Sequence, residues 1–315
     1  MWPFDFFKRD AKKYPLAAES VRFSYSEQEV LQDITLNVKE GTITAIIGKS
    51  GSGKSTFLKL AAGIIAGKYY GKIKIFGRSK VLEKHSVGFV PQEVALIPDL
   101  TIEDNIKIAG LNLGIPEDKA LDKAFDLMKL LRLDESIKKK PFELSGGQKV
   151  RLNIILSLLH NPKVIVLDEP FVGLDFLNRR LLWHFLESLK KKGFSIILTS
   201  HLLTETQDHV DKLVILKEGK VFFKGNMDAL KSKLEIKYVF EVRFSRLSAE
   251  NLGKIKKFCD YKDIKIVDTY EKYMMISLKN QRARNTLTNF FDKLKLEYEE
   301  IGFREPNLDE IFLKA

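Results

Sequence analysis

The amino-acid sequence predicts an α/β protein: a mostly parallel sheet with helices on both faces, followed by a smaller α+β domain. Three observations support this class. The chain has 315 residues, more than one typical domain requires. Between residues 147 and 216, short apolar strands alternate with segments of helical length, which is typical of a parallel sheet. From residue 237, the predicted order is strand, helix, strand, strand, helix, strand.

The first half of the chain mixes antiparallel and buried strands with helices. β-Branched and aromatic residues in 20–38 indicate two or three antiparallel strands, and the apolar run 41–48 indicates a buried strand that ends in a glycine loop. Thr101 followed by Asp104 predicts a capping box at the start of a long helical segment. The remaining elements expected here are a helix over 54–62, strands over 71–76 and 87–90, and helical structure over 101–128.

The second half alternates cleanly and then changes character. The expected elements are helices over 147–160, 176–192 and 203–210, strands over 164–167 and 195–198, a hairpin of 212–216 with 221–223, and a closing helix and linker over 224–234. Beyond these we expect strands over 237–244, 262–269, 273–278 and 297–303, and helices over 248–258, 281–294 and 307–314. The strand–helix order of this last part predicts a ferredoxin-like unit. We therefore divide the chain into a tail (1–14), a main domain (15–230) and an accessory domain (231–315).

Composition excludes some classes of protein and leaves others open. The 53 Lys and Arg exceed the 42 Asp and Glu, a net charge of +11 that favours polyanions such as nucleic acid, acidic lipid or nucleotide phosphates. A lysine-rich surface typical of heat-adapted proteins is an equally good reading. The single cysteine, Cys259, excludes an internal disulfide and fits a reducing compartment. No apolar run reaches the ~18 residues of a membrane span, and the aromatic start, Met1–Arg9, lacks the features of a signal peptide.

A phosphate-binding loop is the strongest motif. Residues 48–56 read Gly-Lys-Ser-Gly-Ser-Gly-Lys-Ser-Thr, which matches G-x-x-x-x-G-K-[ST] between a predicted strand and a predicted helix. Its glycines let backbone N–H groups turn toward phosphate oxygens, and the helix presents its positive end to them. Lys54 can bridge the terminal phosphates of a nucleotide, and the Ser55 hydroxyl can ligate Mg²⁺.

Two acidic residues follow the buried strand over 164–167. In open parallel sheets, ligands lie outside the carboxyl ends of the strands. Asp168 is therefore placed to hold Mg²⁺, and Glu169 is placed to accept a proton from a water that attacks the terminal phosphate. Alone, such a pair is more often just a strand that meets a loop; the phosphate loop makes the catalytic interpretation the better one.

A second anion-binding helix start lies at Leu144-Ser145-Gly146-Gly147-Gln148, where Ser145 can cap the helix. With the phosphate loop and the Asp-Glu pair in this order, the sequence resembles the nucleotide-binding domain of ATP-binding-cassette (ABC) proteins over roughly residues 15–230. The resemblance implies a P-loop NTPase core with an antiparallel β subdomain and a helical subdomain, and ATP with Mg²⁺ as cofactors. It also implies a dimer, of two copies or of paired cassette subunits, in which each ATP lies between the phosphate loop of one subunit and Ser145, Gly146 and Gly147 of the other.

The resemblance assigns roles to four further residues. Tyr25 matches the aromatic residue that stacks on adenine, with a plain strand tyrosine as the alternative. Gln92 matches the loop glutamine that joins the Mg²⁺ and water shell. Asp175 matches the loop that communicates across the dimer, and His201 matches the histidine that contacts the terminal phosphate and orients Glu169.

The full set of implied site residues follows from these motifs. The expected catalytic residues are Glu169, His201, Lys54 and Gln92, and the expected Mg²⁺ ligands are Ser55, Gln92 and Asp168. The expected ATP-binding residues are Tyr25, Gly48, Ser50, Gly51, Ser52, Gly53, Lys54, Ser55, Thr56, Ser145, Gly146, Gly147, Gln148 and Asp175. The sequence departs from the family pattern at Phe176, where proline is usual, and in reading Ser-Gly-Ser in the phosphate loop where many export cassettes read Asn-Gly-Ala.

Several functions fit this pattern. We expect the ATP-hydrolysing subunit of a transporter, peripheral on the cytoplasmic face of the cell membrane, docked on integral membrane subunits through residues 93–115, with no nucleic-acid partner. The segment from Glu305 to Leu313 resembles the end of drug and polysaccharide exporter cassettes, which favours export. An importer ATPase with a regulatory accessory domain is the alternative, followed by a soluble cassette that acts on ribosomes or DNA. The Leu-Ser-Gly-Gly-Gln signature nearly eliminates an unrelated kinase or GTPase.

Overall fold

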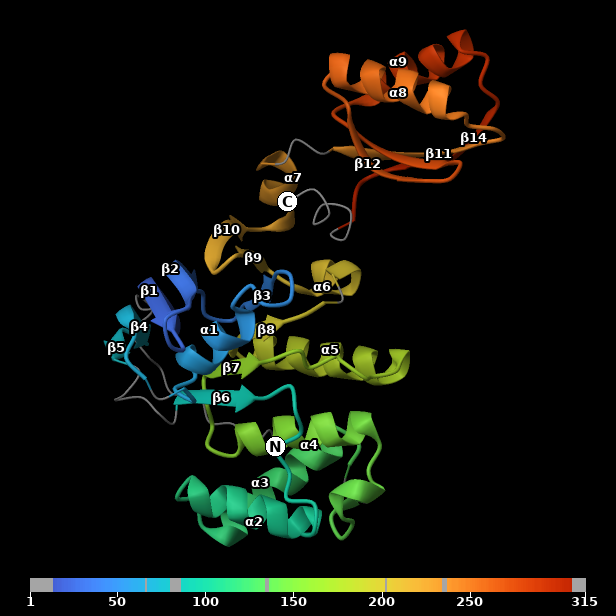
Figure 1. Cartoon of the computed structure of the whole chain (residues 1–315). Helices are drawn as coiled ribbons and strands as arrows, with labels where there is room; N and C mark the ends of the chain where they lie inside the picture. The colour runs from blue at the N-terminus through green and yellow to red at the C-terminus, as the bar shows by residue number, and fades with distance from the viewer. Residues whose placement is uncertain are drawn as a thin grey trace. The chain divides into compact units, whose positions relative to one another are not determined.

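A six-stranded sheet lies at the centre of the first of two compact units, which meet in the chain between Gly225 and Asn226. The structure is a computed structural model that describes residues 14–65, 67–79, 86–133, 136–201, 203–233 and 237–307 (Figure 1). Within these residues the sheet has the order β10-β9-β3-β8-β7-β6. Its strands are β3 (Ile43–Ile47), β6 (Val87–Val90), β7 (Val164–Leu167), β8 (Ser195–Thr199), β9 (Lys212–Lys217) and β10 (Lys220–Gly225). Neighbours from β9 to β6 are parallel, and β10 forms an antiparallel hairpin with β9.

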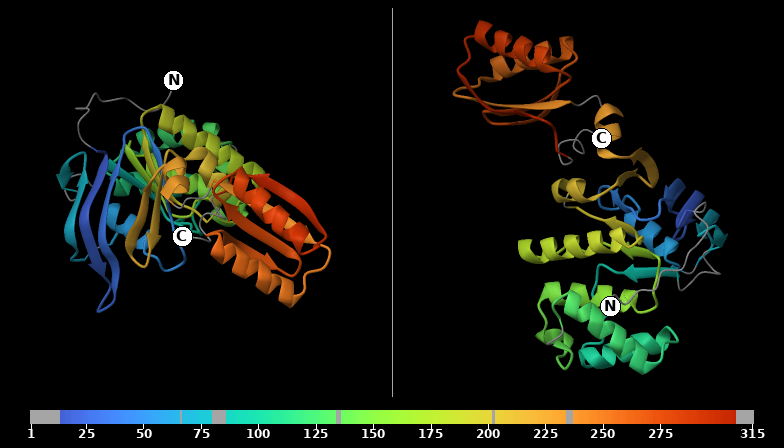
Figure 2. Two further views of the ribbon diagram at one scale, coloured as in Figure 1. Left: turned by 90° about the horizontal axis from the view of Figure 1, so that it is seen from above. Right: turned by 180° about the vertical axis from the view of Figure 1, so that it is seen from behind.

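The middle strands of this sheet are buried on both faces. Every residue of β3, β7 and β8 is buried. Val164 and Val166 of β7 join a cluster with α1 (Lys54–Ala61), whereas the alternation of side chains directs Ile165 and Leu167 to the opposite face. Helix α5 (Phe176–Lys191) contacts β8 and lies across the sheet from α1 (Figure 2). The predicted parallel sheet with helices on both faces is confirmed.

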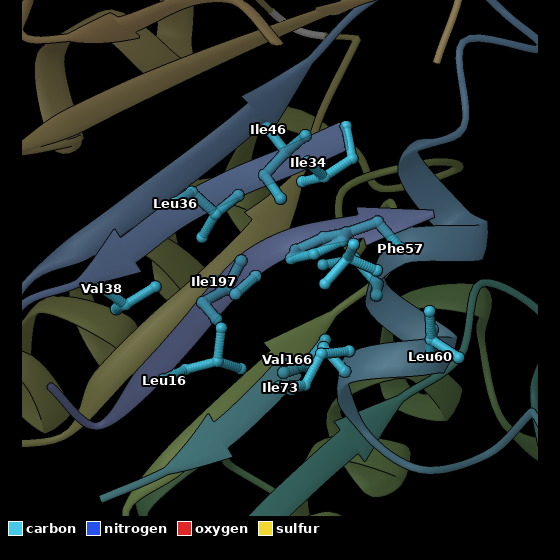
Figure 3. Packing of buried hydrophobic residues seen from close by; sticks show 14 of the residues in the cluster. Leu16, Ile34, Leu36, Val38, Ile46, Phe57, Leu60, Ile73, Val166 and Ile197 are labelled. Carbon is cyan, nitrogen blue, oxygen red and sulfur yellow. The ribbon is translucent and has the colours of Figure 1, made fainter. Parts of the chain in front are cut away.

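An antiparallel sheet packs against α1 on the side away from β7. It has the order β2-β1-β4-β5, formed by β1 (Leu16–Ser24), β2 (Glu29–Val38), β4 (Tyr70–Ile75) and β5 (Arg78–Ser79). Alternate residues of β2, among them Ile34, Leu36 and Val38, point inward and are buried. Figure 3 shows these side chains in one cluster with Phe57 of α1 and Ile197 of β8. One hydrophobic cluster of this unit therefore lies between the two sheets, around α1.

The helical part of the first unit differs in detail from the sequence prediction. In place of one segment over 101–128, the structure has α2 (Ile102–Asn112) and α3 (Glu117–Leu130). Pro116 stands directly before α3. The residue ahead of a proline is disfavoured in the helical region, so one continuous helix cannot run through this position. The remaining elements are a short 3-10 helix, Pro141–Glu143, α4 (Gly146–Leu158), which packs on β6, and α6 (Leu203–His209).

The capping box predicted at Thr101 is only half formed. The Thr101 hydroxyl accepts the Asp104 backbone N–H at 3.1 Å, as an N-cap does. The Asp104 carboxylate, however, accepts the Thr101 hydroxyl at 2.5 Å, where a reciprocal box would bond the N-cap backbone. Aspartate is one methylene shorter than the glutamate of a true box, which explains the shorter connection.

Within the described ranges, no helix has both the length and the apolarity that a bilayer span requires.

The second unit contains the predicted ferredoxin-like arrangement. After α7 (Met227–Lys233), the sheet has the order β12-β13-β11-β14, and all its pairs are antiparallel. The elements are β11 (Tyr238–Phe244), α8 (Ala249–Tyr261), β12 (Lys265–Tyr270), β13 (Tyr273–Leu278), α9 (Gln281–Lys293) and β14 (Tyr298–Arg304). The tail over 1–13 and the helix predicted over 307–314, apart from Asn307, lie outside the described residues. The domain division between residues 230 and 231 stays a prediction.

Aromatic rings hold the second unit together. Phe291 of α9 is fully buried, and its ring lies edge-on to Phe244 and Tyr298 at centroid distances of 5.2 and 5.3 Å. Phe258 of α8 and Phe290 of α9 stack at 3.8 Å, which fixes the two helices side by side. Such pairs add about 0.5–1.5 kcal/mol each beyond the burial of their area.

Phe291→Ala is expected to destabilise the second unit by about 3–5 kcal/mol, because it leaves a cavity at the centre of this aromatic cluster. Thermal unfolding of the full chain, followed by circular dichroism, should show one transition moved down by more than about 10 °C. Tyr261→Ala is the control: its side chain is 81% exposed, so the same transition should stay in place. Equal shifts for the two variants would contradict the assigned core.

Candidate functional site

The phosphate loop links the end of β3 to the start of α1, as predicted. Gly51 and Gly53 adopt φ angles of 79° and 97°, in the left-handed region that favours glycine. Gly48 has no room for a side chain, because a Cβ atom there would lie 2.4 Å from the Leu216 carbonyl oxygen and from the Ser52 hydroxyl. The glycines are therefore required by the shape of the loop, and Ser52 beneath it is buried.

Lys54 is held at the loop by backbone oxygens. Its ammonium group donates to the carbonyl of Gly48 at 2.8 Å and to that of Lys49 at 3.1 Å. Burial lowers the pKa of Lys54 from its usual value, whereas the nearby carboxylates of Glu169 and Asp168 act to raise it. The charge of Lys54 is thus anchored between the loop and two acidic groups.

The turn between β9 and β10 is hydrogen-bonded to the phosphate loop. The Gly219 N–H donates to the Ser52 carbonyl at 3.3 Å, and the Gly219 carbonyl accepts the N–H of Gln32 in β2 at 2.7 Å. Gly219 has a φ of 75°, and a Cβ atom there would lie 2.5 Å from the Val30 carbonyl oxygen. The turn therefore joins the phosphate loop to both sheets.

Asp168 lies at the point where three segments meet. One of its carboxylate oxygens accepts the Ser55 hydroxyl at 2.9 Å and the Thr199 hydroxyl at 2.8 Å. Its own N–H donates to Val90, the last residue of β6, at 2.9 Å. A hydroxyl beside a carboxylate is the oxygen-donor set that Mg²⁺ prefers, and Mg²⁺ usually takes only one or two such ligands from a protein. The residues at this position fit that ion.

Glu169 and His201 form a pair beside Asp168. Nε2 of His201 lies 2.9 Å from Oε1 of Glu169, whose side chain is only 5% exposed. Burial raises the pKa of Glu169, and the charges of His201 and Lys54 act against that rise. Glu169 also has a φ of 51°, an uncommon backbone conformation for a residue other than glycine.

Thr199 is a site residue that the sequence analysis did not identify. Besides its bond to Asp168, its hydroxyl accepts the Glu169 N–H at 2.8 Å. It therefore orients both acidic residues from the neighbouring strand β8. Its signal in the sequence is weak, because it is one hydroxyl residue at the end of an apolar strand, two positions before His201.

Tyr25 and Gln92 make no hydrogen bond or ion pair with Lys54, Asp168 or Glu169 among the described contacts. Tyr25 is in the turn between β1 and β2, 57% exposed, with its ring edge-on to Phe23 at 4.9 Å. The first residues of β2 touch the loop, since a Cβ atom on Gly53 would lie 2.8 Å from Leu31. Gln92 is exposed, two residues beyond the end of β6.

The signature segment forms a capped helix start. Ser145 accepts the Gln148 N–H at 3.3 Å, and the Gln148 side chain accepts the Ser145 N–H at 2.9 Å, a complete capping box. Ser145 and Gly146 are exposed, whereas a Cβ atom on Gly147 would lie 2.9 Å from the Asn178 side chain.

Asp175 caps α5 next to this segment. Its carboxylate accepts both the N–H and the side-chain amide of Asn178, at 2.9 and 2.7 Å. These hydrogen bonds hold the pKa of Asp175 below its usual value. Asn178 thus touches both Asp175 and Gly147, which places the two predicted interface segments side by side. Phe176, at the position where the family has proline, begins α5 and is 64% exposed.

One chain does not bring the two anion-binding turns together. No hydrogen bond or ion pair joins residues 48–56 to residues 145–148, all of which are described. The signature helix α4 packs on β6, which is separated from β3 by β8 and β7. Three strand spacings amount to about 14 Å. The remaining predicted residues, Ser50 and Thr56, lie within the loop and the first turn of α1.

Comparison with known proteins agrees with this geometry. Residues 31–172 match the family described as ABC transporter. The chain is 26% identical to the linearmycin resistance ATP-binding protein LnrL of Bacillus subtilis, over 95% of this chain and 97% of that protein. It is 31% identical to the lantibiotic transport ATP-binding protein SrtF of Streptococcus pyogenes, over 70% and 95% respectively.

Solved structures give the same result. An ATP-binding subunit of an ABC transporter superposes with a TM-score of 0.63 at 30% identity, over 69% of this chain and 92% of that one. The dimeric post-hydrolysis state of the cassette MJ0796, bound to ADP and Pi, has a TM-score of 0.60 at 26% identity, over 67% and 98%. Identity above 30% along most of a relative's own length shows that the chain belongs to the ABC transporter family, in which it is an ATP-binding, ATP-hydrolysing subunit.

Proposed function

We propose that this subunit hydrolyses ATP as a dimer, with two Mg·ATP sites at the interface, and that it drives export through separate membrane subunits. One observation carries the dimer: the phosphate loop and the signature helix start are both formed, yet no hydrogen bond or ion pair joins them within one chain. Two copies docked head to tail would place each helix start against the partner's phosphate loop. The cassette MJ0796 is a dimer in its post-hydrolysis state.

The proposed catalytic base is Glu169. Burial raises its pKa, and this strengthens it as an acceptor for the proton of the attacking water. His201, at 2.9 Å, orients the carboxylate and offers its imidazole to the terminal phosphate. Lys54 holds the phosphate oxygens in place with a charge that the loop carbonyls already anchor.

Ser55, Asp168 and Gln92 are the residues that would hold Mg²⁺. When bound, the ion neutralises charge on the phosphate oxygens. Thr199 keeps the Asp168 carboxylate directed toward Ser55, because both hydroxyls donate to the same oxygen.

Export through a membrane partner is supported by the relatives. The named activities are linearmycin resistance, lantibiotic transport and Nod factor export. We propose a peripheral position on the cytoplasmic face of the membrane and docking through residues 93–115. This segment includes exposed apolar side chains, namely Val94, Ile97 and Leu111. Membrane subunits present apolar and polar loops to which such a mixed surface is suited.

Glu169→Gln is expected to reduce the ATPase rate by about 10²–10⁴-fold, because the amide cannot accept the proton of the attacking water. ATP binding should be preserved, so the variant should accumulate as a dimer with ATP in analytical ultracentrifugation. Glu271→Gln, an exposed residue of the second unit, is the matched control and should hydrolyse ATP normally. A Glu169→Gln protein that stays monomeric with ATP would contradict the proposed dimer.

His201→Ala is expected to lower the rate and to move the acid limb of the pH–rate profile to higher pH. The charge of His201 lowers the pKa of Glu169, so its removal lets the pKa rise further. A carboxylate with a higher pKa is protonated, and lost as a base, at a higher pH. His184→Ala, whose side chain is 63% exposed, should leave the limb unchanged. An unchanged limb in His201→Ala would argue against Glu169 as the base.

Co-purification from native membranes tests the transporter assignment. We expect a multi-spanning membrane protein to remain bound, as mass spectrometry would show, and exchange of Val94 and Leu111 for serine should weaken its retention. The control is Tyr270→Ser, an exposed aromatic of the second unit. Ribosomal or DNA-bound partners without a membrane protein would leave the ATPase intact but overturn the transport proposal.

A further inference from the structure

Three stacked rings join the segment that follows Glu169 to the helix that follows His201. Phe171 and Trp183 stack with centroids 4.3 Å apart and planes 25° apart. Trp183 and His209 stack on the other side, at 4.4 Å and 15°. The rings come from the loop after β7, from α5 and from the last residue of α6. We call Phe171, Trp183 and His209 the aromatic column.

The two ends of the aromatic column lead directly to Glu169 and His201. Phe171 follows Glu169 by two residues. Helix α6 begins two residues after His201 and ends at His209. The position of α6 relative to the loop after β7 therefore sets how far His201 lies from Glu169. That distance is 2.9 Å between Nε2 and Oε1.

Two ion pairs fix α6 on α5 in addition to the rings. His209 Nδ1 lies 2.7 Å from the Glu187 carboxylate, which holds the plane of the imidazole. Arg179 lies 3.0 Å from Glu205 at the start of α6. Helix α6 has only seven residues, too few to be stable without such contacts.

Packing encloses the His201 side chain far less than it encloses the side chain of its partner, Glu169. The His201 side chain is 56% exposed, whereas that of Glu169 is 5% exposed. Packing around the imidazole therefore does not determine where it lies, and the backbone that carries it must do so. Because a misplacement of about 1 Å can reduce a catalytic rate by about 10²-fold, the support of that backbone matters.

The tryptophan is not explained by packing alone. Trp183 is 3% exposed, and among the described residues no acceptor bonds its buried indole N–H. A buried N–H without a partner costs free energy that leucine or phenylalanine would not incur. The wide indole, however, stacks on Phe171 with one face and on His209 with the other.

From these contacts we infer that Trp183 and His209 are positioning residues for ATP hydrolysis, which hold His201 in register with Glu169. The inference rests on the proposed roles of Glu169 and His201. The rings of Trp183 and His209 act on the site indirectly, through the loop after β7 and through α6.

The test compares Trp183→Leu with Trp183→Phe in the full chain. Leucine removes the stack and phenylalanine retains an aromatic ring between the other two. We expect Trp183→Leu to lower kcat for ATP about tenfold with KM within twofold, and Trp183→Phe to restore most of the rate. His209→Leu removes both the stack on Trp183 and the pair with Glu187 and should reproduce the loss, whereas His209→Phe keeps a stacked ring and should lose less.

A thermodynamic cycle separates positioning from general damage. In the His201→Ala background, Trp183→Leu should cause no further loss in single-turnover rate, because the residue that it positions is already gone. Losses that multiply, or a Trp183→Leu protein with normal kcat, would overturn the inference. If His201→Ala and Glu169→Gln themselves retained turnover, the proposed function would fail instead.

Discussion

The hydrogen bonds accepted by Asp168 are the interaction on which the site depends. One carboxylate oxygen of Asp168 accepts hydrogen bonds from the hydroxyls of Ser55 and Thr199. These bonds join the start of α1 and the end of β8 to the end of β7. A buried carboxylate is costly unless it is paired or hydrogen-bonded. This requirement aligns the carboxyl ends of adjacent parallel strands, and the position of Glu169, one residue later, follows from it.

Burial of charge then determines the chemistry. Lys54, Asp168 and Glu169 are each less than 10% exposed and lie close enough for their charges to affect one another. Backbone carbonyls bond Lys54 and hydroxyls bond Asp168, so these two groups need little reorganisation when a nucleotide binds. The signature helix start differs, because Ser145 and Gly146 are exposed. The contrast agrees with a site completed by a second subunit.

Local patterns in the sequence predicted the parts of the site that depend on local geometry. The phosphate loop, the capped start of α4 and the strand before Asp168 are short patterns whose conformation follows from glycine, serine and β-branched residues. Thr199 and the aromatic column could not be predicted, because their contacts join residues 12 to 31 positions apart with no motif. Pro116 itself indicates an interruption of the helical segment, but the helical periodicity continues on both sides of it.

The turn at Gly219 has a consequence for anyone who alters this chain. Its backbone bonds both Ser52 and Gln32, and its α-carbon faces the Val30 carbonyl with no space for a methyl group. Hairpin tips are usually the first choice for an inserted tag or fluorophore, since they lie on the surface and tolerate added residues. The tip at Gly219 is an exception, because an insertion there would displace the backbone that bonds Ser52 of the phosphate loop. The tip between β12 and β13, at Glu271, is exposed and is the better place for a label.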